Sequence, residues 1–226
     1  MKRFESLPRA ILIVLALLIF HSCKRRDDWT QRIANSTLRE VELLLDSIYD
    51  KDQYYRHQLK PTRNTFGLNS RQVTQLWEII DYTDSSNLTL VTAVLDQKGW
   101  LGIEEIGAIA NEALFLVLQH ADVSTQAIYL PMMRQAVEEG NARKNSLAML
   151  EDRVAFRTNG KQIYGSQIGR DTFTGEYYVL PLVNPDSVNV RRARMNLGSI
   201  EGYVSRYNID WNLSNYKKWH KERESE

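Results

Sequence analysis

The sequence predicts a mainly α protein, a single multi-helix domain with a small β-hairpin near its C-terminal third. Over most of the chain, apolar residues recur at steps of three and four, the period of a helix with one buried face. Residues 161–182 differ, because tyrosines and β-branched residues flank a Thr174-Gly175 turn there, which indicates one hairpin. No linker rich in Gly, Pro or Ser divides residues 36–208, so we expect one helical domain over that range.

Four helices are expected in the first half of this domain. The first covers residues 36–60 and ends at Pro61, and the second covers residues 71–82. The third covers residues 86–97 and ends at Gly99. The fourth follows a loop and has one apolar stripe, made of Ile106, Ile109, Ala110, Ala113, Leu114 and Val117.

Two further helices are expected before the hairpin. Ser124 is suited to cap a helix that runs to Gly140, and Asn145 is suited to cap another that ends at Asn159-Gly160. The second of these is apolar on two sides, which is typical of a helix packed on both.

The hairpin and the C-terminal segments complete the domain. Its two strands are expected at residues 162–164 and 177–180. Short helices should follow at residues 185–195 and 199–207. Residues 209–226 are expected to form a charged C-terminal tail that frays toward its end.

The N-terminus carries the features of a secretory signal peptide, assigned to residues 1–22. Basic residues precede the uncharged run Ala10–Phe20, which is too short to span a bilayer. The following Phe20-His21-Ser22-Cys23 resembles the lipobox of bacterial lipoproteins, which implies that Cys23 is lipidated, with palmitate among its acyl chains, and that residues 23–35 form an anchor and tether. The alternative is simple cleavage that leaves Cys23, the only cysteine, as a stray thiol.

The charge balance limits the partners of the mature chain. Residues 1–22 hold three basic groups and one acidic group, so 26 basic and 27 acidic side chains remain. This near-neutral balance excludes a nucleic-acid-binding protein, and Lys24-Arg25-Arg26 is better placed near anionic lipid headgroups. We therefore expect an outer-membrane lipoprotein in the cell envelope of a Gram-negative-type bacterium, whose partners are the bilayer and a small polar ligand or an envelope protein. The following Asp27-Asp28 resembles sorting signals for the outer face, yet the periplasmic and surface faces both remain open.

No motif in the sequence assigns a cofactor or a reaction. The chain lacks a phosphate-binding Gly-rich loop, a Cys/His metal spacing, an H-E-x-x-H pair and a G-x-S-x-G elbow. The remaining candidates are polar residues at positions where the pattern favours apolar ones.

Asp52 is the clearest of these, because it falls on the apolar stripe of the first helix and Arg56 lies one turn later. A buried carboxylate needs a partner, so the two side chains should pair with each other or with a group from another helix. The alternative is an exposed surface pair on a helix whose end faces water. We assign both residues to a ligand-binding set.

A second group lies between the fourth and fifth helices, at Gln119, His120 and Asp122. A helix C-terminus favours a charged imidazole, and a histidine held by a carboxylate can act as a general base or acid. Ser124 is expected to be the helix cap, which leaves the Asp122 carboxylate available. The alternative assigns both His120 and Asp122 to capping the helix ends.

A third group lies on the sixth helix and the hairpin. Asp152 and Arg153 flank apolar stripes and should be partly desolvated, whereas an inter-helix salt bridge is the structural alternative. Tyr164 and Gln167 offer neutral donors and acceptors for a ligand, although ordinary strand positions are the alternative. His120, Asp122 and Asp152 lack a recognised metal spacing, so no metal site is assigned.

These polar residues belong to short motifs that occur in a fixed order. The motifs are Asp52-Gln53-x-x-Arg56, Gly99-Trp100, Gln119-His120-Ala121-Asp122, Leu147-Ala148-x-Leu150-x-Asp152-Arg153-Val154, Gly160-x-Gln162-x-Tyr164-Gly165-Ser166-Gln167 and Val190-Arg191-Arg192. With them the sequence resembles a widespread bacterial family classed only as a domain of unknown function, over about residues 43–204. The family usually has Thr at Ser166 and often Pro at Leu101. The resemblance implies a family, with no reaction and no fold attached.

Three functions remain open, and the sequence leaves undecided whether the protein is an enzyme. The first is a binding module, in which a polar pocket between helices holds a small polar ligand or peptide; its ligand-binding residues would be Asp52, Arg56, Gln119, Tyr164 and Gln167. The second is a hydrolase in which His120 is the general base, Asp122 or Asp152 orients it and Arg153 stabilises negative charge. The third is a structural or interaction protein of the envelope, in which the same residues form a buried network.

Overall fold

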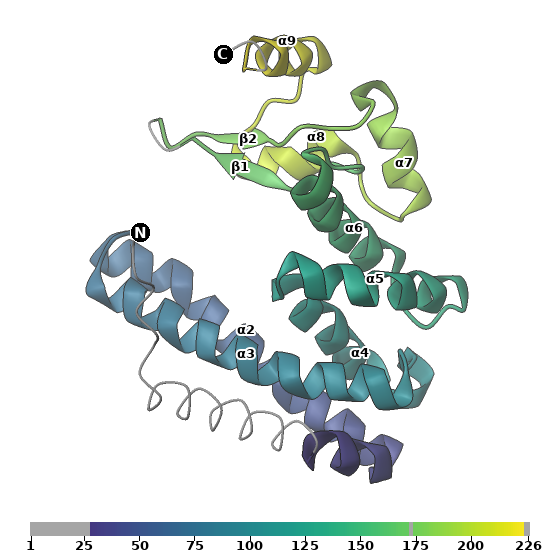
Figure 1. The fold of residues 1–226 in the computed structure, drawn as a ribbon. Coiled ribbons are helices and arrows are strands. Elements are labelled where there is room, and N and C mark those ends of the chain that lie inside the picture. The colour runs from purple at the N-terminus through teal and green to yellow at the C-terminus, as the bar shows by residue number, and fades with distance from the viewer. Residues whose placement is uncertain (1–27, 172–173, 224–226) are drawn as a thin grey trace, which may run out of the picture. The chain divides into compact units, whose positions relative to one another are not determined.

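The computed structural model describes residues 28–171 and 174–223, so the predicted signal peptide and Cys23 lie outside the described part. It confirms a mainly α chain with a two-stranded antiparallel hairpin in the C-terminal third (Figure 1). The described residues divide into two compact units, one up to residue 99 and one from residue 100, which are described in turn. Among the residues described, no helix combines the length and the apolar content that a bilayer crossing requires.

The first unit is built on two long helices that lie side by side, α2 (Leu38–Phe66) and α3 (Arg71–Lys98), preceded by helical residues 28–35 (Figure 1). Thr37 and Glu40 form a capping box at the start of α2, in which each side chain accepts a hydrogen bond from the other residue's backbone N–H. The helices bury one apolar face each, made of Val41, Leu45 and Ile48 on α2 and of Val73, Ile80, Val91, Val94 and Leu95 on α3.

Two predicted helix boundaries in this unit were wrong. Pro61 lies inside α2, which ends only at Gly67, a residue with φ of 89°. The predicted second and third helices are one continuous helix, α3. Within it the hydroxyls of Ser85 and Ser86 donate at 3.0 Å to the carbonyls of Asp81 and Tyr82 one turn earlier, as serines inside a helix do.

The second unit begins with three helices that pack against one another, α4 (Ile103–His120), α5 (Val123–Glu138) and α6 (Lys144–Asn159). The predicted number and order of helices are correct here. The cap of α6 is Arg143 rather than Asn145, and the helix ends as expected at Gly160, which has the left-handed φ of 71°. Fully buried apolar side chains fill the space between the helices, among them Leu114, Leu118, Met133 and Leu150.

The hairpin consists of β1 (Ile168–Arg170) and β2 (Tyr177–Val179), with Gly169 opposite Tyr178. The second strand lies where the sequence predicts it, but the first does not lie at residues 162–164. Gln162 forms only an isolated parallel bridge with Leu182, and the loop around it is shaped by side-chain hydrogen bonds described below.

Short helices follow the hairpin, in the order η1 (Pro185–Ser187), α7 (Val188–Arg194), α8 (Ile200–Val204) and η2 (Ser205–Tyr207). They match the two predicted helical segments. A small apolar core joins them to the hairpin, and it consists of Val179, Leu182, Val188, Ile200 and Val204.

The C-terminal segment differs from the frayed tail that its charge predicts, because residues Leu213–Arg223 form α9 (Figure 1). Two of its side chains attach it to β2 and the segment after it. The Tyr216 hydroxyl accepts a hydrogen bond of 2.7 Å from the N–H of Leu182, and a ring nitrogen of His220 lies 2.9 Å from the carbonyl of Val179. These contacts to buried backbone give α9 a fixed place that charge composition alone does not reveal.

Candidate functional site

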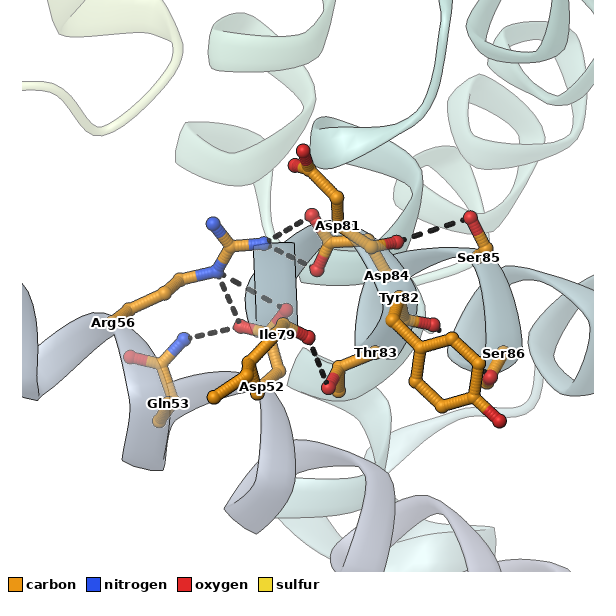
Figure 2. A network of polar contacts seen from close by, with 10 residues as sticks. All are labelled: Asp52, Gln53, Arg56, Ile79, Asp81, Tyr82, Thr83, Asp84, Ser85 and Ser86. Atoms are coloured by element: carbon orange, nitrogen blue, oxygen red, sulfur yellow. Dashed lines mark hydrogen bonds and ion pairs between the residues drawn. The ribbon is translucent and has the colours of Figure 1, made fainter. Parts of the chain in front are cut away.

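The first group of candidate residues forms a polar network between α2 and α3 (Figure 2). The carboxylate of Asp52, which is 3% exposed, accepts hydrogen bonds from Arg56 Nε at 3.2 Å and from Gln53 Nε2 at 2.7 Å. Nη2 of Arg56 reaches across to α3 and donates to the two carboxylate oxygens of Asp84 at 2.6 and 2.7 Å. Asp52 and Arg56 thus pair with each other and also with another helix.

The chemistry of Arg56 explains why this position holds an arginine. Its guanidinium presents several donors in one plane, so one side chain bonds two carboxylates at once, which a lysine ammonium does less well. The Arg56 side chain is 18% exposed and that of Asp84 is 25% exposed, so solvent screens the pair only in part. The network therefore ties the middle of α2 to the middle of α3.

The second group lies at the junction of α4 and α5. His120 is the last residue of α4 and is half-buried, while the neighbouring Gln119 is buried. The N-cap of α5 is Asp122, so the expectation that Ser124 would cap the helix was wrong. The Asp122 carboxylate accepts hydrogen bonds from the Ser124 hydroxyl and from the Thr125 N–H and hydroxyl, the latter two at 2.9 Å. These donors, that of Ser124 foremost, lower the pKa of Asp122 to about 2.

Gln126 is a buried residue of this junction that the sequence analysis missed. Its side chain is fully buried, and its amide nitrogen donates to the carbonyls of Gln119 and Ala121 at 2.9 and 3.0 Å. Those carbonyls belong to the end of α4, where the helix leaves them without an internal partner. A glutamine on the buried stripe of Tyr129, Leu130 and Met133 was the available signal.

The third group is centred on Asp152, whose side chain on α6 is fully buried. One of its oxygens accepts from the backbone N–H groups of Ile163 at 2.6 Å and Tyr164 at 2.7 Å. The other accepts from the N–H of Ser166 at 2.7 Å. Burial raises the pKa of the Asp152 carboxyl, and the three N–H donors act in the opposite direction by stabilising the anion.

Further buried side chains fix the same loop, residues 161–167. The Gln162 amide nitrogen donates to the carbonyls of Gln167 and Leu180, both at 2.9 Å, and its oxygen accepts from the Gln167 N–H at 2.7 Å. The Ile163, Tyr164 and Ser166 carbonyls accept hydrogen bonds from three other side chains, those of Arg191, Arg192 and Tyr203 respectively. Both arginines occur in the sequence motifs but were not predicted as site residues.

Tyr164 and Gln167 are held at half-buried positions of this loop. The Tyr164 hydroxyl donates to Glu151 at 2.8 Å, and Arg134 donates to the other oxygen of that carboxylate at 2.7 Å. Burial, together with the hydrogen bond to Glu151, raises the pKa of Tyr164. Gln167 donates to the Ser166 hydroxyl at 3.0 Å. The loop thus brings Asp152, Tyr164 and Gln167 together, and Glu151 is a member that the sequence analysis missed.

The hydrogen bonds of the two candidate catalytic carboxylates determine what they can do. Asp122 caps α5, and Asp152 holds three backbone N–H groups of the loop. Carboxylate oxygens engaged in this way are poorly placed to orient an imidazole or to ligate a metal ion as well. Arg153 follows Asp152 on α6 and is half-buried.

A family model described as a family of unknown function, DUF6624, matches residues 40–214. The chain belongs to the DUF6624 family. All three groups of polar residues fall within the DUF6624 match, which ends at the second residue of α9. No curated protein and no solved structure shows a detectable match to this chain.

Proposed function

We propose that this DUF6624 protein is a lipid-anchored module of the cell envelope that binds a small polar ligand or peptide. The anchoring part of the proposal is supported by the basic and apolar segment in residues 1–22 and by the cysteine at position 23. The binding part is supported by the loop at residues 161–167.

The single observation that carries the binding function is the preorganisation of that loop. It has no regular secondary structure, yet side chains of Asp152, Gln162, Arg191, Arg192 and Tyr203 satisfy its backbone groups. A loop fixed before binding loses little conformational entropy when a ligand arrives. The side chains it offers are those of Tyr164 and Gln167, which stay partly exposed.

The same hydrogen bonds weaken the hydrolase alternative. A hydrolase built on His120 needs Asp122 or Asp152 as the group that orients the imidazole. The carboxylate oxygens of Asp122 instead accept hydrogen bonds from Thr125 in the first turn of α5. Those of Asp152 accept hydrogen bonds from backbone N–H groups of the loop. This observation favours a structural use for these two aspartates, as the envelope-protein alternative requires.

Ligand binding is tested with the full chain in detergent, by thermal denaturation against a panel of amino acids, short peptides and other small polar compounds. A ligand of the loop should raise the melting temperature of the wild type, and Gln167→Ala should reduce that increase. Gln58→Ala, on an exposed position of α2, is the matched control and should leave the increase unchanged. An increase that survives Gln167→Ala would contradict the assignment to the loop.

Anchoring is tested by metabolic labelling with an alkyne fatty acid in a Gram-negative host. The wild type should incorporate the label and fractionate with membranes, whereas Cys23→Ser should lose both properties. A Cys23→Ser variant that remains labelled would contradict lipidation at Cys23, and an unlabelled wild type would favour the stray-thiol alternative.

A further inference from the structure

A cleft of about 230 Å³ opens between β2 and α9 in the second unit. Its walls are mainly aromatic, and the rings come from Tyr178 on β2, from Trp211 before α9 and from Tyr216, Trp219 and His220 on α9. The cleft shares no residue with the loop at 161–167. It is smaller than the roughly 300–1,000 Å³ of typical sites for drug-sized ligands, so it suits a single ring-sized group.

The rings form one continuous wall. The ring centroids of Tyr178 and Trp219 lie 4.8 Å apart, those of Trp219 and His220 4.6 Å, those of His220 and Tyr216 4.4 Å and those of Tyr216 and Trp211 5.0 Å. All five side chains are only half-buried. Covering this partly exposed aromatic surface with an apolar face lowers the free energy, because it removes the surface from water.

Polar groups stand at the edge of this wall. Asp210, Asn212 and Asn215 line the cleft and are exposed. The Asn212 side-chain oxygen accepts a hydrogen bond of 2.9 Å from the N–H of Asn215. This bond fixes the Asn212 side chain at the start of α9. Within the part of the chain that the structure describes, the Asp210 carboxylate and the Asn215 amide make no hydrogen bond, so they are available to a ligand.

The basic residues of α9 do not make the cleft positive, because Lys217 pairs with Asp186 at 2.7 Å and Arg223 pairs with Asp171 at 3.1 Å. Helix α9 carries Lys217, Lys218, Lys221 and Arg223 against the single acidic residue Glu222. The Arg223 guanidinium already lies 4.1 Å from the centroid of the Trp219 ring and 5.7 Å from that of Tyr178. The carboxylate of Asp210 lines the cleft itself, so an acidic ligand would meet a like charge there.

We propose that this cleft binds one ring of a neutral saccharide. A pyranose ring with equatorial hydroxyls has flat C–H faces that pack on aromatic rings, while its hydroxyls lie in the plane and reach groups such as Asn215 and Asp210. The ring-sized volume, the aromatic wall and the neutral amides at its edge match that chemistry. The inference goes beyond the proposed function, because the cleft is a second site that shares no residue with the loop at 161–167.

The test uses the full chain in a detergent without a sugar headgroup, because a glycosidic detergent would compete. Cellotriose and chitotriose are titrated, and binding is followed by calorimetry and by tryptophan fluorescence. We expect saturable binding, reduced about tenfold or more by Trp219→Ala. Trp77→Ala is the matched control, since Trp77 lies on α3 in the first unit, and it should leave the affinity unchanged.

A second variant covers the case in which Trp219→Ala does not fold. Asn215→Ala keeps every ring and removes one exposed amide, and it should reduce the affinity about three- to tenfold. A pull-down with purified cell-wall glycan distinguishes two sources of the sugar, a polymeric glycan and free oligosaccharides. Sedimentation of the wild type with that glycan, lost in Trp219→Ala, assigns the site to the polymer, and trisaccharide binding without sedimentation assigns it to free oligosaccharides.

Three results would overturn the inference. They are the absence of binding to both trisaccharides and to the glycan, binding that is unchanged in Trp219→Ala and Asn215→Ala, and binding of choline or a peptide in the cleft in place of the sugars. Gln167→Ala separates this inference from the proposed function. If Gln167→Ala abolishes saccharide binding and Trp219→Ala leaves it unchanged, the sugar binds at the loop. That result overturns the proposal for the cleft and leaves the proposed binding function intact.

Discussion

One carboxylate oxygen of Asp152 accepts a hydrogen bond of 2.7 Å from the backbone N–H of Ser166, on a loop that follows the helix carrying the aspartate. The other oxygen serves Ile163 and Tyr164 in the same way. A helix residue therefore determines the path of a loop that has no regular secondary structure. The loop's half-buried side chains, including Gln167, depend on this arrangement for their positions.

Replacing Asp152 with Asn should destabilise the protein strongly. The amide oxygen can still accept from two N–H groups, but the amide nitrogen would meet the third donor, leaving a buried N–H without an acceptor. We expect a loss of about 2–4 kcal/mol in the free energy of unfolding, measured by urea denaturation. Asp210→Asn, on an exposed position of the same unit, should change it by less than about 0.5 kcal/mol. Equal effects from the two variants would disprove the role given to Asp152.

Arg56 and Asp84 should show strong coupling in a double-mutant cycle. Their hydrogen bonds of 2.6 and 2.7 Å are short and only partly exposed to solvent. The cycle Arg56→Ala, Asp84→Ala should give a coupling free energy of about 1–3 kcal/mol by chemical denaturation. The pair Arg39 and Glu42 on the same helix α2 is the control and should give less than about 1 kcal/mol, because the Arg39 side chain is 68% exposed whereas that of Arg56 is 18% exposed. Coupling no larger than that control would show that the network does not hold the two helices together.

The members of this network show what a sequence reveals and what it hides. Asp52 could be predicted, because it interrupts the apolar stripe of a helix whose start was predicted within two residues. Asp84 lies on the buried stripe of α3 between Ile80 and Asn87, yet it was missed because the polar run at residues 83–86 predicts a break between helices. Those residues favour caps and turns in general. In the long helix their hydroxyls bond back to carbonyls one turn earlier.

The loop at residues 161–167 was beyond prediction for a different reason. That Asp152 is partly desolvated follows from the two apolar stripes of its helix. Its partners are backbone N–H groups, which nearly every residue has, so the sequence does not mark them. Their positions depend on how the loop folds over α6. The same holds for α9, whose charged sequence indicates fraying, while its docking depends on two side chains that reach backbone atoms of β2 and the segment after it. Contacts of this kind leave no periodic signal.

The cap at Asp122 makes stability depend on pH in a defined direction. Its pKa is lowered to about 2 in the folded chain, below the ordinary value near 3.9 of an unfolded aspartate. The cap therefore stabilises the fold above about pH 4, and this contribution is lost as the pH falls toward about 2. Asp122→Asn keeps a capping oxygen without a titrating group. It should lose less stability than the wild type between about pH 4 and pH 2 in urea denaturation, whereas Asp122→Ala should already cost about 1 kcal/mol at pH 7. An unchanged pH dependence in Asp122→Asn would contradict the assignment.

Gly165, the one glycine of the loop that Asp152 holds, should tolerate substitution poorly. Its φ is 78°, and a Cβ atom there would lie 2.8 Å from the terminal methyl carbon of Ile200, a fully buried residue. Gly165→Ala therefore combines backbone strain with overpacking, and we expect a loss of about 2–4 kcal/mol by urea denaturation. Two controls separate these causes. Gly160→Ala, at a residue with a φ of 71° and open space, should show the strain alone, about 1 kcal/mol, and Gly198→Ala, at a residue with open space and no positive φ, should be nearly neutral. A Gly165→Ala variant no less stable than Gly160→Ala would show that the loop can move away from Ile200, which would contradict the preorganisation on which the binding proposal rests.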